Sequence, residues 1–299
     1  MTSRQRALYV VLAIAALAAA IGLQVTRDRL YGASARETER LLYIRSGTAA
    51  RGAALAFQAT AADIYWIRAI QHYGGDRLAP DRPHRYELLA PLLDLTTALD
   101  PYFTIAYRFG AIFLSEPYPG GPGRPDEAIA LLKKGLTAQP TKWQYFHDIA
   151  FVYYWHRSDP VTASQWFKRA SEQPRAPNWL GPVAANMLIE GGDRQKARWL
   201  WRQIQQSEEP WLQRSAERTL QQLDALDAID QLQEVVRRFP PAPGGSYSWH
   251  DLVSRRVLPG VPLDPSGTPF ALNGETGEVT LTPTSPLLPL PRHSPRRLP

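Results

Sequence analysis

The chain has 299 residues, of which 44% are hydrophobic and 21% charged, and its formal net charge is +6. This length suits one large or two small folded domains with a buried core. Basic residues are interspersed with acidic ones, which argues against a nucleic-acid-binding surface. Because the chain contains no cysteine, disulfides, thiolate metal sites and cysteine nucleophiles are excluded.

The N-terminus combines a short tail, residues 1–6, with an uncharged apolar segment, residues 7–26. A helix of that length spans about 30 Å, the thickness of the hydrocarbon core of a bilayer. We therefore predict one transmembrane helix over 7–26. Two alternatives are a signal peptide cleaved at the alanines within the segment and a buried soluble helix.

Residues 33–239 have apolar side chains at spacings of three and four and no convincing alternation, so we predict an all-α domain. Proline and glycine clusters should divide it into antiparallel helix pairs. The expected breaks are at Gly74-Gly75, Asp100-Pro101, residues 117–125, Gln139-Pro140, residues 174–177, Gly191-Gly192 and Pro210.

Four sequence columns recur at intervals of about 34 residues, which is the spacing of a helical repeat. A small residue is followed by a large apolar one, by a third position and by a helix-ending proline. The columns are Ala128, Ala163 and Ala197; Leu132, Phe167 and Trp201; Gly135, Ala170 and Ile204; and Pro140, Pro174 and Pro210.

This pattern resembles the tetratricopeptide repeat (TPR) family. In the first helices, Phe109-Gly110 with Phe113 and Ile149-Ala150 with Tyr153 are similar to the Leu-Gly-x-x-Tyr core of that family. The resemblance covers residues 86–210, after a degenerate unit whose first helix would be residues 52–73. It implies a TPR-like α-solenoid whose concave groove, lined by first helices, binds peptides of protein partners.

Aromatic residues are dense between positions 143 and 211. If Tyr153 occupies the core column, neighbouring side chains of the same helix must face the groove, since successive residues turn by about 100°. Exposed aromatic residues are typical of binding hot spots. The candidate partner-binding residues are His147, Phe151, Tyr154, Trp155 and Trp179.

A long helix is predicted over residues 211–239, followed by a Pro-rich module at residues 240–282. The stretch Asp264-Pro265-Ser266-Gly267-Thr268-Pro269-Phe270 reads as a turn leading into a small β-hairpin. It resembles the tail of type II secretion major pseudopilins, although Ser266 replaces their usual Trp and their acidic calcium-binding cluster is missing. The resemblance thus implies shape without polymerisation or metal binding. Residues 283–299 are predicted to be a disordered Pro/Arg tail.

The six histidines lack metal-ligand spacing, no nucleophile elbow or nucleotide-binding loop occurs, and carboxylates such as Asp224 and Asp227 read as a solvated helix face. We therefore predict a protein that is not an enzyme and has no cofactor, metal or nucleic-acid partner. The alternative is an accessory subunit or hydrolase with a dispersed site, built from residues such as His147, Asp148 and His156.

The combined prediction is a membrane-anchored TPR scaffold that mediates protein–protein interactions in a bacterial cell-envelope assembly, such as a pilus-like, secretion or surface-polysaccharide system. The simplest topology is single-pass in the inner (cytoplasmic) membrane, with residues 1–6 inside and the bulk of the chain periplasmic or extracytoplasmic. Arg27 and Arg29, however, nearly balance Arg4 and Arg6 in the positive-inside rule. A cytosol-facing membrane adaptor is therefore the alternative topology.

Overall fold

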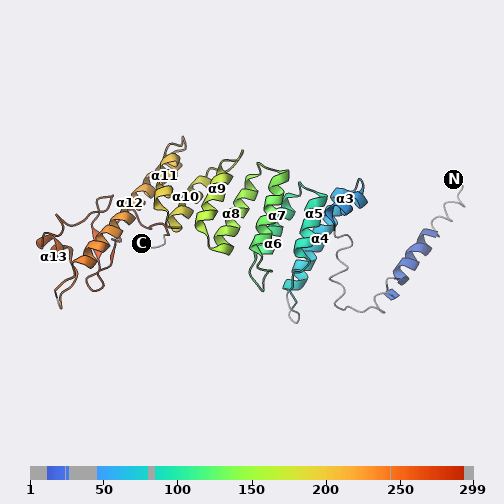
Figure 1. Cartoon of the computed structure of the whole chain (residues 1–299), viewed down its shortest axis with the longest axis horizontal. Helices are drawn as coiled ribbons and strands as arrows, with labels where there is room; N and C mark the ends of the chain where they lie inside the picture. Colours follow the sequence, from blue (N-terminus) through green and yellow to red (C-terminus); the bar gives the residue numbers. More distant parts are fainter. Residues whose placement is uncertain (1–11, 24, 27–45, 80–84, 243, 293–299) are drawn as a thin grey trace. The chain divides into compact units, whose positions relative to one another are not determined.

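A computed structural model of the chain describes residues 12–23, 25–26, 46–79, 85–242 and 244–292. These residues are mostly helical with one small two-stranded sheet, which confirms the predicted predominance of helix (Figure 1). The chain divides into two compact units, Met1–Pro101 and Tyr102–Pro299.

Near the N-terminus, residues 12–23 form a helix whose side chains are exposed. Among the residues that the structure describes, no helix has both the length and the hydropathy needed to cross a bilayer. Part of the predicted span, residues 7–11 and 24, lies outside that set. The transmembrane helix therefore has no support from the structure and stays a prediction from the sequence.

The described part of the first unit also contains the helices α3 (Gly47–Ala54), α4 (Gln58–Arg77) and α5 (Leu89–Leu99). Helix α5 is the apolar centre of the unit, because leucines on several of its faces are buried against α3 and α4. Gly47 allows a close approach of α3 to α5, since a Cβ at Gly47 would lie 2.6 Å from that of Ala98.

Two predictions for the first unit are wrong. The single helix over residues 52–73 is divided at Leu55, whose φ of 50° ends α3. The break at Gly74-Gly75 does not occur, because α4 continues to Arg77. Neither glycine has a neighbour within 4 Å of a Cβ position, and an exposed helical glycine costs only about 1 kcal/mol, which tertiary packing can offset.

The connection from α4 to α5 is held by side chains of α4. Asp76 Oδ2 accepts a hydrogen bond from the backbone N–H of Tyr86 at 2.7 Å, and His72 Nε2 accepts one from Leu88 at 3.2 Å. Burial lowers the pKa of His72 below its ordinary value, although the charges of Asp76 and Glu87 act to raise it. His72 is thus kept neutral as a hydrogen-bond acceptor.

In the second unit, consecutive helices pack against one another, an arrangement compatible with a helical solenoid (Figure 1). The breaks predicted after residue 100 all separate helices here. The helices are α6 (Thr104–Ser115), α7 (Pro125–Ala138), α8 (Trp143–Arg157), α9 (Pro160–Ser171), α10 (Leu180–Glu190), α11 (Arg194–Gln205) and α12 (Pro210–Arg238).

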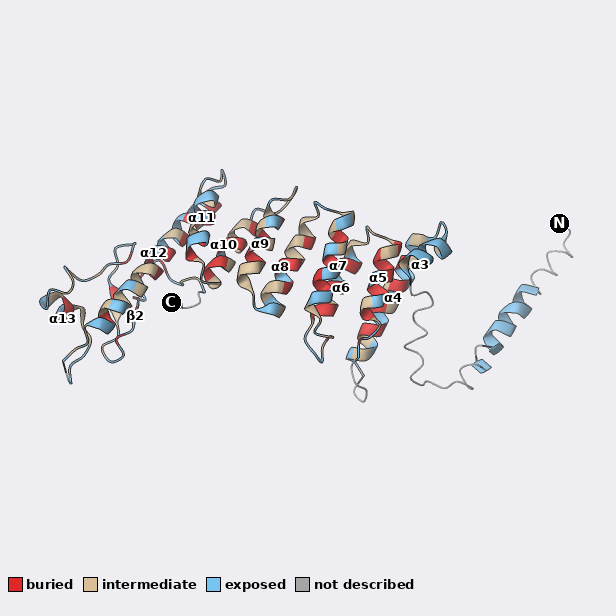
Figure 2. Cartoon of the chain, viewed as in Figure 1, coloured by how far each residue is buried: buried red, intermediate tan, exposed pale blue. Residues whose placement is uncertain are grey.

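The repeated columns of α7, α9 and α11 are part of the buried core of this unit (Figure 2). The small-residue column and the large-residue column are both buried, whereas Ile204 at the third position is half-buried. Gly135 is required at its position because a Cβ there would lie 2.9 Å from the Tyr145 ring. The sequence columns thus correspond to real packing positions.

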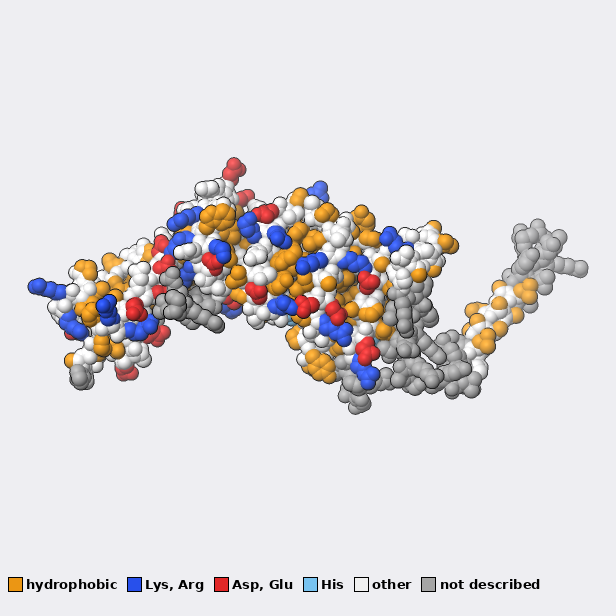
Figure 3. All heavy atoms as spheres, in the orientation of Figure 1, with side chains coloured by type: hydrophobic (Ala, Val, Ile, Leu, Met, Phe, Trp, Pro, Cys, Tyr) orange, Lys and Arg blue, Asp and Glu red, His pale blue; other side chains and the backbone are white. Residues whose placement is uncertain are grey.

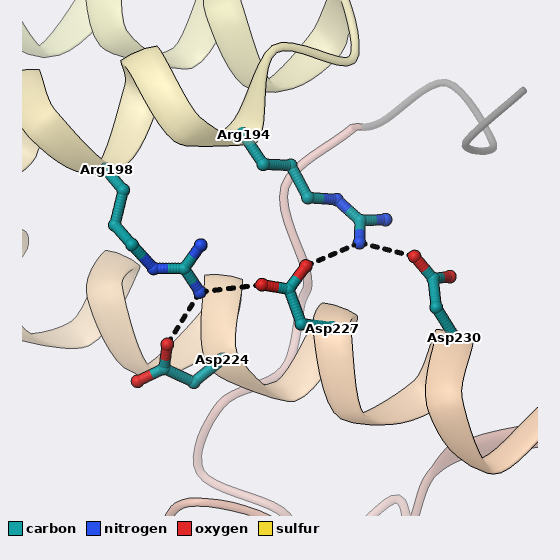
Figure 4. Close-up of polar contacts among 5 residues, drawn as sticks. All are labelled: Arg194, Arg198, Asp224, Asp227 and Asp230. Carbon is teal, nitrogen blue, oxygen red and sulfur yellow. Dashed lines mark hydrogen bonds and ion pairs between the residues drawn. The ribbon is translucent and has the colours of Figure 1, made fainter. Parts of the chain in front are cut away.

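Helices α11 and α12 are joined by a network of charges (Figure 4). Arg194 Nη1 donates to Asp227 Oδ1 at 2.9 Å and to Asp230 Oδ2 at 2.6 Å. Arg198 Nη2 donates to Asp224 Oδ1 at 2.6 Å and to Asp227 Oδ2 at 3.0 Å. The prediction of an ordinary solvated face holds for Asp224, whose side chain is 59% exposed, and is wrong for Asp227, which links two arginines.

The end of α12 carries the C-terminal module, which contains α13 (Trp249–Ser254), β1 (Phe270–Leu272) and β2 (Val279–Leu281). The strands pair antiparallel, with Ala271 opposite Thr280. Gln233 of α12 clamps the hairpin: its Nε2 donates to Gly277 O at 2.9 Å, and its Oε1 accepts from Val279 N at 2.9 Å. A short hairpin thus lies inside the predicted module.

The predicted turn before the hairpin is centred on the buried carboxylate of Asp264. It accepts hydrogen bonds from Ser266 N at 2.8 Å and Thr268 N at 2.9 Å, while Gly267 has the positive φ, 86°, expected of its position. Burial alone would raise the pKa of Asp264, but hydrogen bonds from Ser266, Ser285 and Thr268 outweigh it and hold the pKa below its ordinary value.

The prediction of a disordered tail is wrong for residues 283–292. Leu287 is buried, and Gln222 of α12 donates from Nε2 to Leu287 O at 2.7 Å and to Pro289 O at 2.9 Å. Prolines exclude regular secondary structure but do not prevent an extended segment from packing. Residues 293–299 lie outside the described residues.

Candidate protein-binding surface

Helix α8 holds most of the predicted partner-binding residues. Its buried face consists of Tyr145, Ile149, Ala150 and Val152. Tyr153, which the sequence analysis placed in the core column, is only half-buried beside the core cluster. The orientation of α8 is therefore set by the four fully buried residues, and the opposite face remains open.

Three predicted residues, His147, Phe151 and Trp155, are spaced by four along α8 and so form one stripe. The Phe151 and Trp155 ring centroids are 6.1 Å apart. Trp155 is 63% exposed and Phe151 38% exposed. Both rings therefore leave apolar area open to contact with another molecule.

His147 begins this stripe inside a group of aromatic rings. The centroids of Phe167 and Trp179 lie 5.6 and 5.8 Å from the imidazole, both near edge-to-face, and Trp143 lies at 6.2 Å. Trp179 itself is 42% exposed. The structure thus brings His147 and Trp179 together, and we call His147, Phe151, Trp155 and Trp179 the α8 surface.

Tyr154, the fifth predicted residue, is half-buried on the same helix. Its hydroxyl donates to Glu190 of α10 at 3.0 Å. Burial, followed by the hydrogen bond to Glu190, raises the pKa of Tyr154. The Tyr154 and Trp155 ring centroids are 5.4 Å apart, but the Tyr154 hydroxyl is bonded to α10, so Tyr154 is left out of the α8 surface.

An apolar stripe on α6 was missed from the sequence. Ile105, Phe109 and Ile112 follow the three- and four-residue spacing of one helix face, and each is about half exposed. Phe109 had been matched to a core position of the repeat. Apart from Thr104, Arg108 and Ser115, α6 consists of apolar or aromatic residues and a glycine, and that excess was the available signal.

An ion pair links α6 to α8 beside the α8 surface. Arg108 Nη2 donates to Asp148 Oδ1 at 3.1 Å, and Nε donates to Oδ2 at 2.5 Å. The hydrogen bond to Asp148 raises the pKa of Arg108, and His147 Nδ1 lies 2.9 Å from Asp148 Oδ1. Because these charges neutralise one another, the surface offers a partner mainly aromatic and apolar area.

The first unit exposes apolar side chains of its own. Ile64, Ile67 and Ile70 of α4 are each about half exposed. Arg68 lies over the Tyr65 ring at 5.6 Å on the same helix. This α4 stripe contains neither tryptophan nor histidine, unlike the α8 surface.

A cavity of about 620 Å³ lies at the start of α11, lined by Gly191, Gly192, Arg194, Arg198 and Asp227 among others. Its arginines are engaged with the carboxylates shown in Figure 4. These ion pairs join α11 to α12, but Arg194 Nη2 is buried and has no hydrogen-bond partner among the described residues.

The residues of the predicted dispersed active site do not converge. His147 and His156 are nine positions apart on one helix, which separates them by about 13 Å along its axis. Asp148 is shared between Arg108 and His147. In the part of the chain that the structure describes, no group of three or more histidines and carboxylates could hold a metal ion.

Figure 3 shows hydrophobic side chains exposed among charged ones over the helices of the second unit. Comparisons with models of protein families, with characterised proteins and with solved structures gave no match. The functional argument therefore depends on the geometry of this chain.

Proposed function

We propose that this chain is a membrane-anchored scaffold of TPR-like repeats that binds a protein partner through the α8 surface. The observation that carries the proposal is the stripe of open aromatic rings at Phe151 and Trp155 beside Trp179, on a helix whose other face is fully buried. Tryptophan and tyrosine are enriched among residues that dominate binding energy.

The chemistry of the surface favours an apolar or aromatic segment of the partner. The neighbouring Arg108–Asp148 pair is bidentate and needs no outside counter-charge. The α6 stripe, Ile105, Phe109 and Ile112, adds apolar area on a helix that packs against α8. A partner segment that covered both helices would bury aromatic and aliphatic side chains together.

The wider proposal places this scaffold in a cell-envelope assembly. Its supports are the uncharged segment 7–26 and the hairpin module after the repeats, with its Asp264-Pro265-Ser266-Gly267 turn. A membrane anchor would concentrate the repeat domain next to envelope partners, which raises effective concentration without new contacts.

The experiment compares Trp155→Ala with Trp199→Ala, because Trp199 is a tryptophan of similar exposure, 54%, on a different helix. Partners are cross-linked in membranes of the source cells and quantified. We expect Trp155→Ala to weaken one defined partner by about 2 kcal/mol, roughly 30-fold, while Trp199→Ala leaves it unchanged. Thermal melting should be within error for both variants.

Equal recovery of every partner with Trp155→Ala and Trp199→Ala would refute the α8 surface. Loss of binding in both variants would show general adhesion of exposed tryptophan. A large fall in melting temperature for Trp155→Ala alone would show that Trp155 stabilises the fold, and would argue against its role in binding.

A further inference from the structure

The cavity at the start of α11 is lined by a buried cation with unused hydrogen-bond donors. Arg194 is only 8% exposed. Its Nη1 binds Asp227 and Asp230, whereas its Nη2 has no hydrogen-bond partner among the described residues. Figure 4 shows this second terminal nitrogen turned away from both carboxylates. A buried donor without an acceptor costs free energy, and a ligand that supplied an acceptor would remove that cost.

Two glycines shape the wall of the cavity. A Cβ at Gly191 would lie 2.6 Å from Val161 Cγ2, so glycine is required where the turn passes α9. Gly192 has a φ of 82° and no atom within 4 Å of its Cβ position, which leaves the backbone of the turn uncovered. The cavity volume of about 620 Å³ lies within the range of about 300–1,000 Å³ that is typical of small-ligand sites.

The N-terminus of α11 lies at the same cavity and is already capped. Asp193 Oδ1 accepts a hydrogen bond from Lys196 N at 3.0 Å, and Oδ2 accepts one from Lys196 Nζ at 2.6 Å. The chain itself therefore supplies the negative charge that a helix N-terminus favours. The backbone amides of Arg194 and Gln195, the first two of the helix, have no acceptor within it, and both residues line the cavity.

The charged side chains around the cavity are paired with one another. Five ion pairs join three cations to four carboxylates: Arg194, Lys196 and Arg198 to Asp193, Asp224, Asp227 and Asp230. Because the carboxylates exceed the cations by one, an anionic ligand would meet a net negative surrounding. An uncharged oxygen could accept from Arg194 Nη2 without adding to that charge.

A primary amide matches the remaining lining as well. It has one carbonyl acceptor and two N–H donors. Asp193 and Asp227 both line the cavity, and a carboxylate has about four lone-pair sites, of which the two arginines occupy two on Asp227. Val161 adds apolar area next to these polar groups. The lining thus offers donors for the carbonyl oxygen and acceptors for the amide N–H groups.

We propose that the cavity at the start of α11 is a binding site for a primary amide, whose carbonyl oxygen accepts a hydrogen bond from Arg194 Nη2. Asparagine and glutamine side chains and small free amides share this chemistry. The site goes beyond the α8 surface, because its residues lie on α9, α11, α12 and the turn before α11. Either site can exist without the other.

The test titrates the full chain, labelled with ¹⁵N-glycine, with propanamide and with propionate, which has the same shape and a negative charge. Gly191 and Gly192 report on the cavity, and Gly135 in the core of α7 is the internal control. Propanamide should shift the two cavity signals to saturation and leave that of Gly135 unchanged. Propionate should bind at least tenfold more weakly.

The variants test the donor and the space separately. Arg194→Lys keeps the charge but lacks the second terminal nitrogen, so the affinity for propanamide should fall at least tenfold. Arg198→Lys is the control, because Arg198 Nη2 is already bonded to Asp224 and Asp227, and it should change the affinity less than twofold. Gln195→Phe, at an exposed position of the lining, should weaken binding by filling the cavity with every charge kept.

Blocked Gly-Gln-Gly and Gly-Glu-Gly peptides distinguish the sources of the amide. Binding of the glutamine peptide at least as tight as that of propanamide would assign the site to a protein side chain, and binding of propanamide alone would assign it to a small free amide. The glutamate peptide should bind neither way.

Three results would overturn the proposal. Propionate that binds as tightly as propanamide would show an anion site, and the absence of any saturable shift would show that the cavity holds water only. Equal propanamide affinity of the wild type and Arg194→Lys would show that Nη2 is not the donor. If Arg194→Lys does not fold, Gln195→Phe decides the question, because unchanged affinity in that variant would place the amide outside the cavity.

Discussion

Trp201 of α11 is 1% exposed in a cluster with Phe167 and Ala216, yet its indole Nε1 has no hydrogen-bond partner among the described residues. Trp201→Ala should cost about 3–5 kcal/mol of unfolding free energy, because the emptied volume cannot collapse fully. Trp201→Phe should cost only about 1–2 kcal/mol, since it keeps the ring and removes an unpaired donor. Urea denaturation measures both. Equal losses would mean that the indole N–H has an acceptor.

At Gly135, in contrast to Trp201, there is no space for a larger side chain. Its Cβ would lie 2.9 Å from Tyr145 and 3.1 Å from Tyr107, two buried rings whose centroids are 5.4 Å apart. Gly135→Ala should therefore destabilise the protein by about 1–3 kcal/mol through overpacking, despite the better helix propensity of alanine. The control is Gly181→Ala, whose nearest contact would be an ordinary 3.8 Å. A higher melting temperature for Gly135→Ala than for the wild type would contradict this packing.

At the scale of elements, polar pairs join helices whose paired residues lie far apart in the sequence. These pairs fix the relative orientation of the helices, which apolar packing alone would not. Asp227 is bonded to both Arg194, whose side chain is 9% exposed, and Arg198. Asp227→Ala should cost about 2–4 kcal/mol because a nearly buried guanidinium loses a partner. Asp224→Ala, at a 59% exposed carboxylate, should cost under about 1 kcal/mol. The two are compared by urea denaturation, and similar losses would argue against the bridging role.

The connection between α4 and α5 should respond to acid. Burial depresses the pKa of His72 from its ordinary value of 6.5, so the unfolded chain binds more protons than the folded one below neutrality. Stability from this group is therefore present above about pH 6.5 and is lost as the pH falls from there toward the folded-state pKa. Protonation also removes the acceptor for Leu88 N–H.

Hydrogen exchange of the Leu88 amide, corrected for its intrinsic pH dependence, reports this loss locally. Protection should fall between pH 7.5 and pH 5.5 in the wild type. His72→Gln retains an acceptor but cannot titrate, so its protection should change much less. A wild type and variant with the same pH dependence would show that His72 does not control the connection.

Sequence patterns predicted the elements well where chemistry is local. Helices α7 and α9 end within three residues of Pro140 and Pro174, α12 begins at Pro210, and the alanine column and the column of large apolar residues are buried. Sequence patterns failed where contact with a distant residue determines the structure. Gly74 stays within α4 because the helix packs on α5. The backbone of residues 287–292 is bound by Gln222, more than sixty positions away. No spacing rule encodes such pairs.

The candidate surface was predictable in composition and only partly in geometry. The spacing of His147, Phe151 and Trp155 by four placed them on one stripe without knowledge of the fold. Tyr154 was separated from them by its bond to Glu190, and the α6 stripe needed the observed exposure of Phe109 to be recognised. Neither feature could be predicted from the sequence, because each depends on which atoms of other helices lie nearby.

At the scale of the whole molecule, the prediction to test is the membrane anchor. Residues 7–26 carry no charge, and a helix of that length would span about 30 Å. We therefore predict that the intact chain resists alkaline carbonate extraction and that deletion of residues 2–26 releases it.

A single charge distinguishes a bilayer-spanning helix from a merely adhesive one. Leu17→Arg puts a cation near the middle of the segment, at a cost of about 2.5–3.5 kcal/mol for insertion. Arg4→Ala changes the flank without that penalty and is the control. We expect Leu17→Arg to shift the chain into the carbonate supernatant and Arg4→Ala to leave it in the pellet. The intact mass of the mature protein distinguishes an anchor from a signal peptide, because a mass lower by about the first twenty residues would mean that the segment is cleaved. Release of the wild-type chain by carbonate would show that it is not anchored in the membrane and would contradict that part of the proposed function.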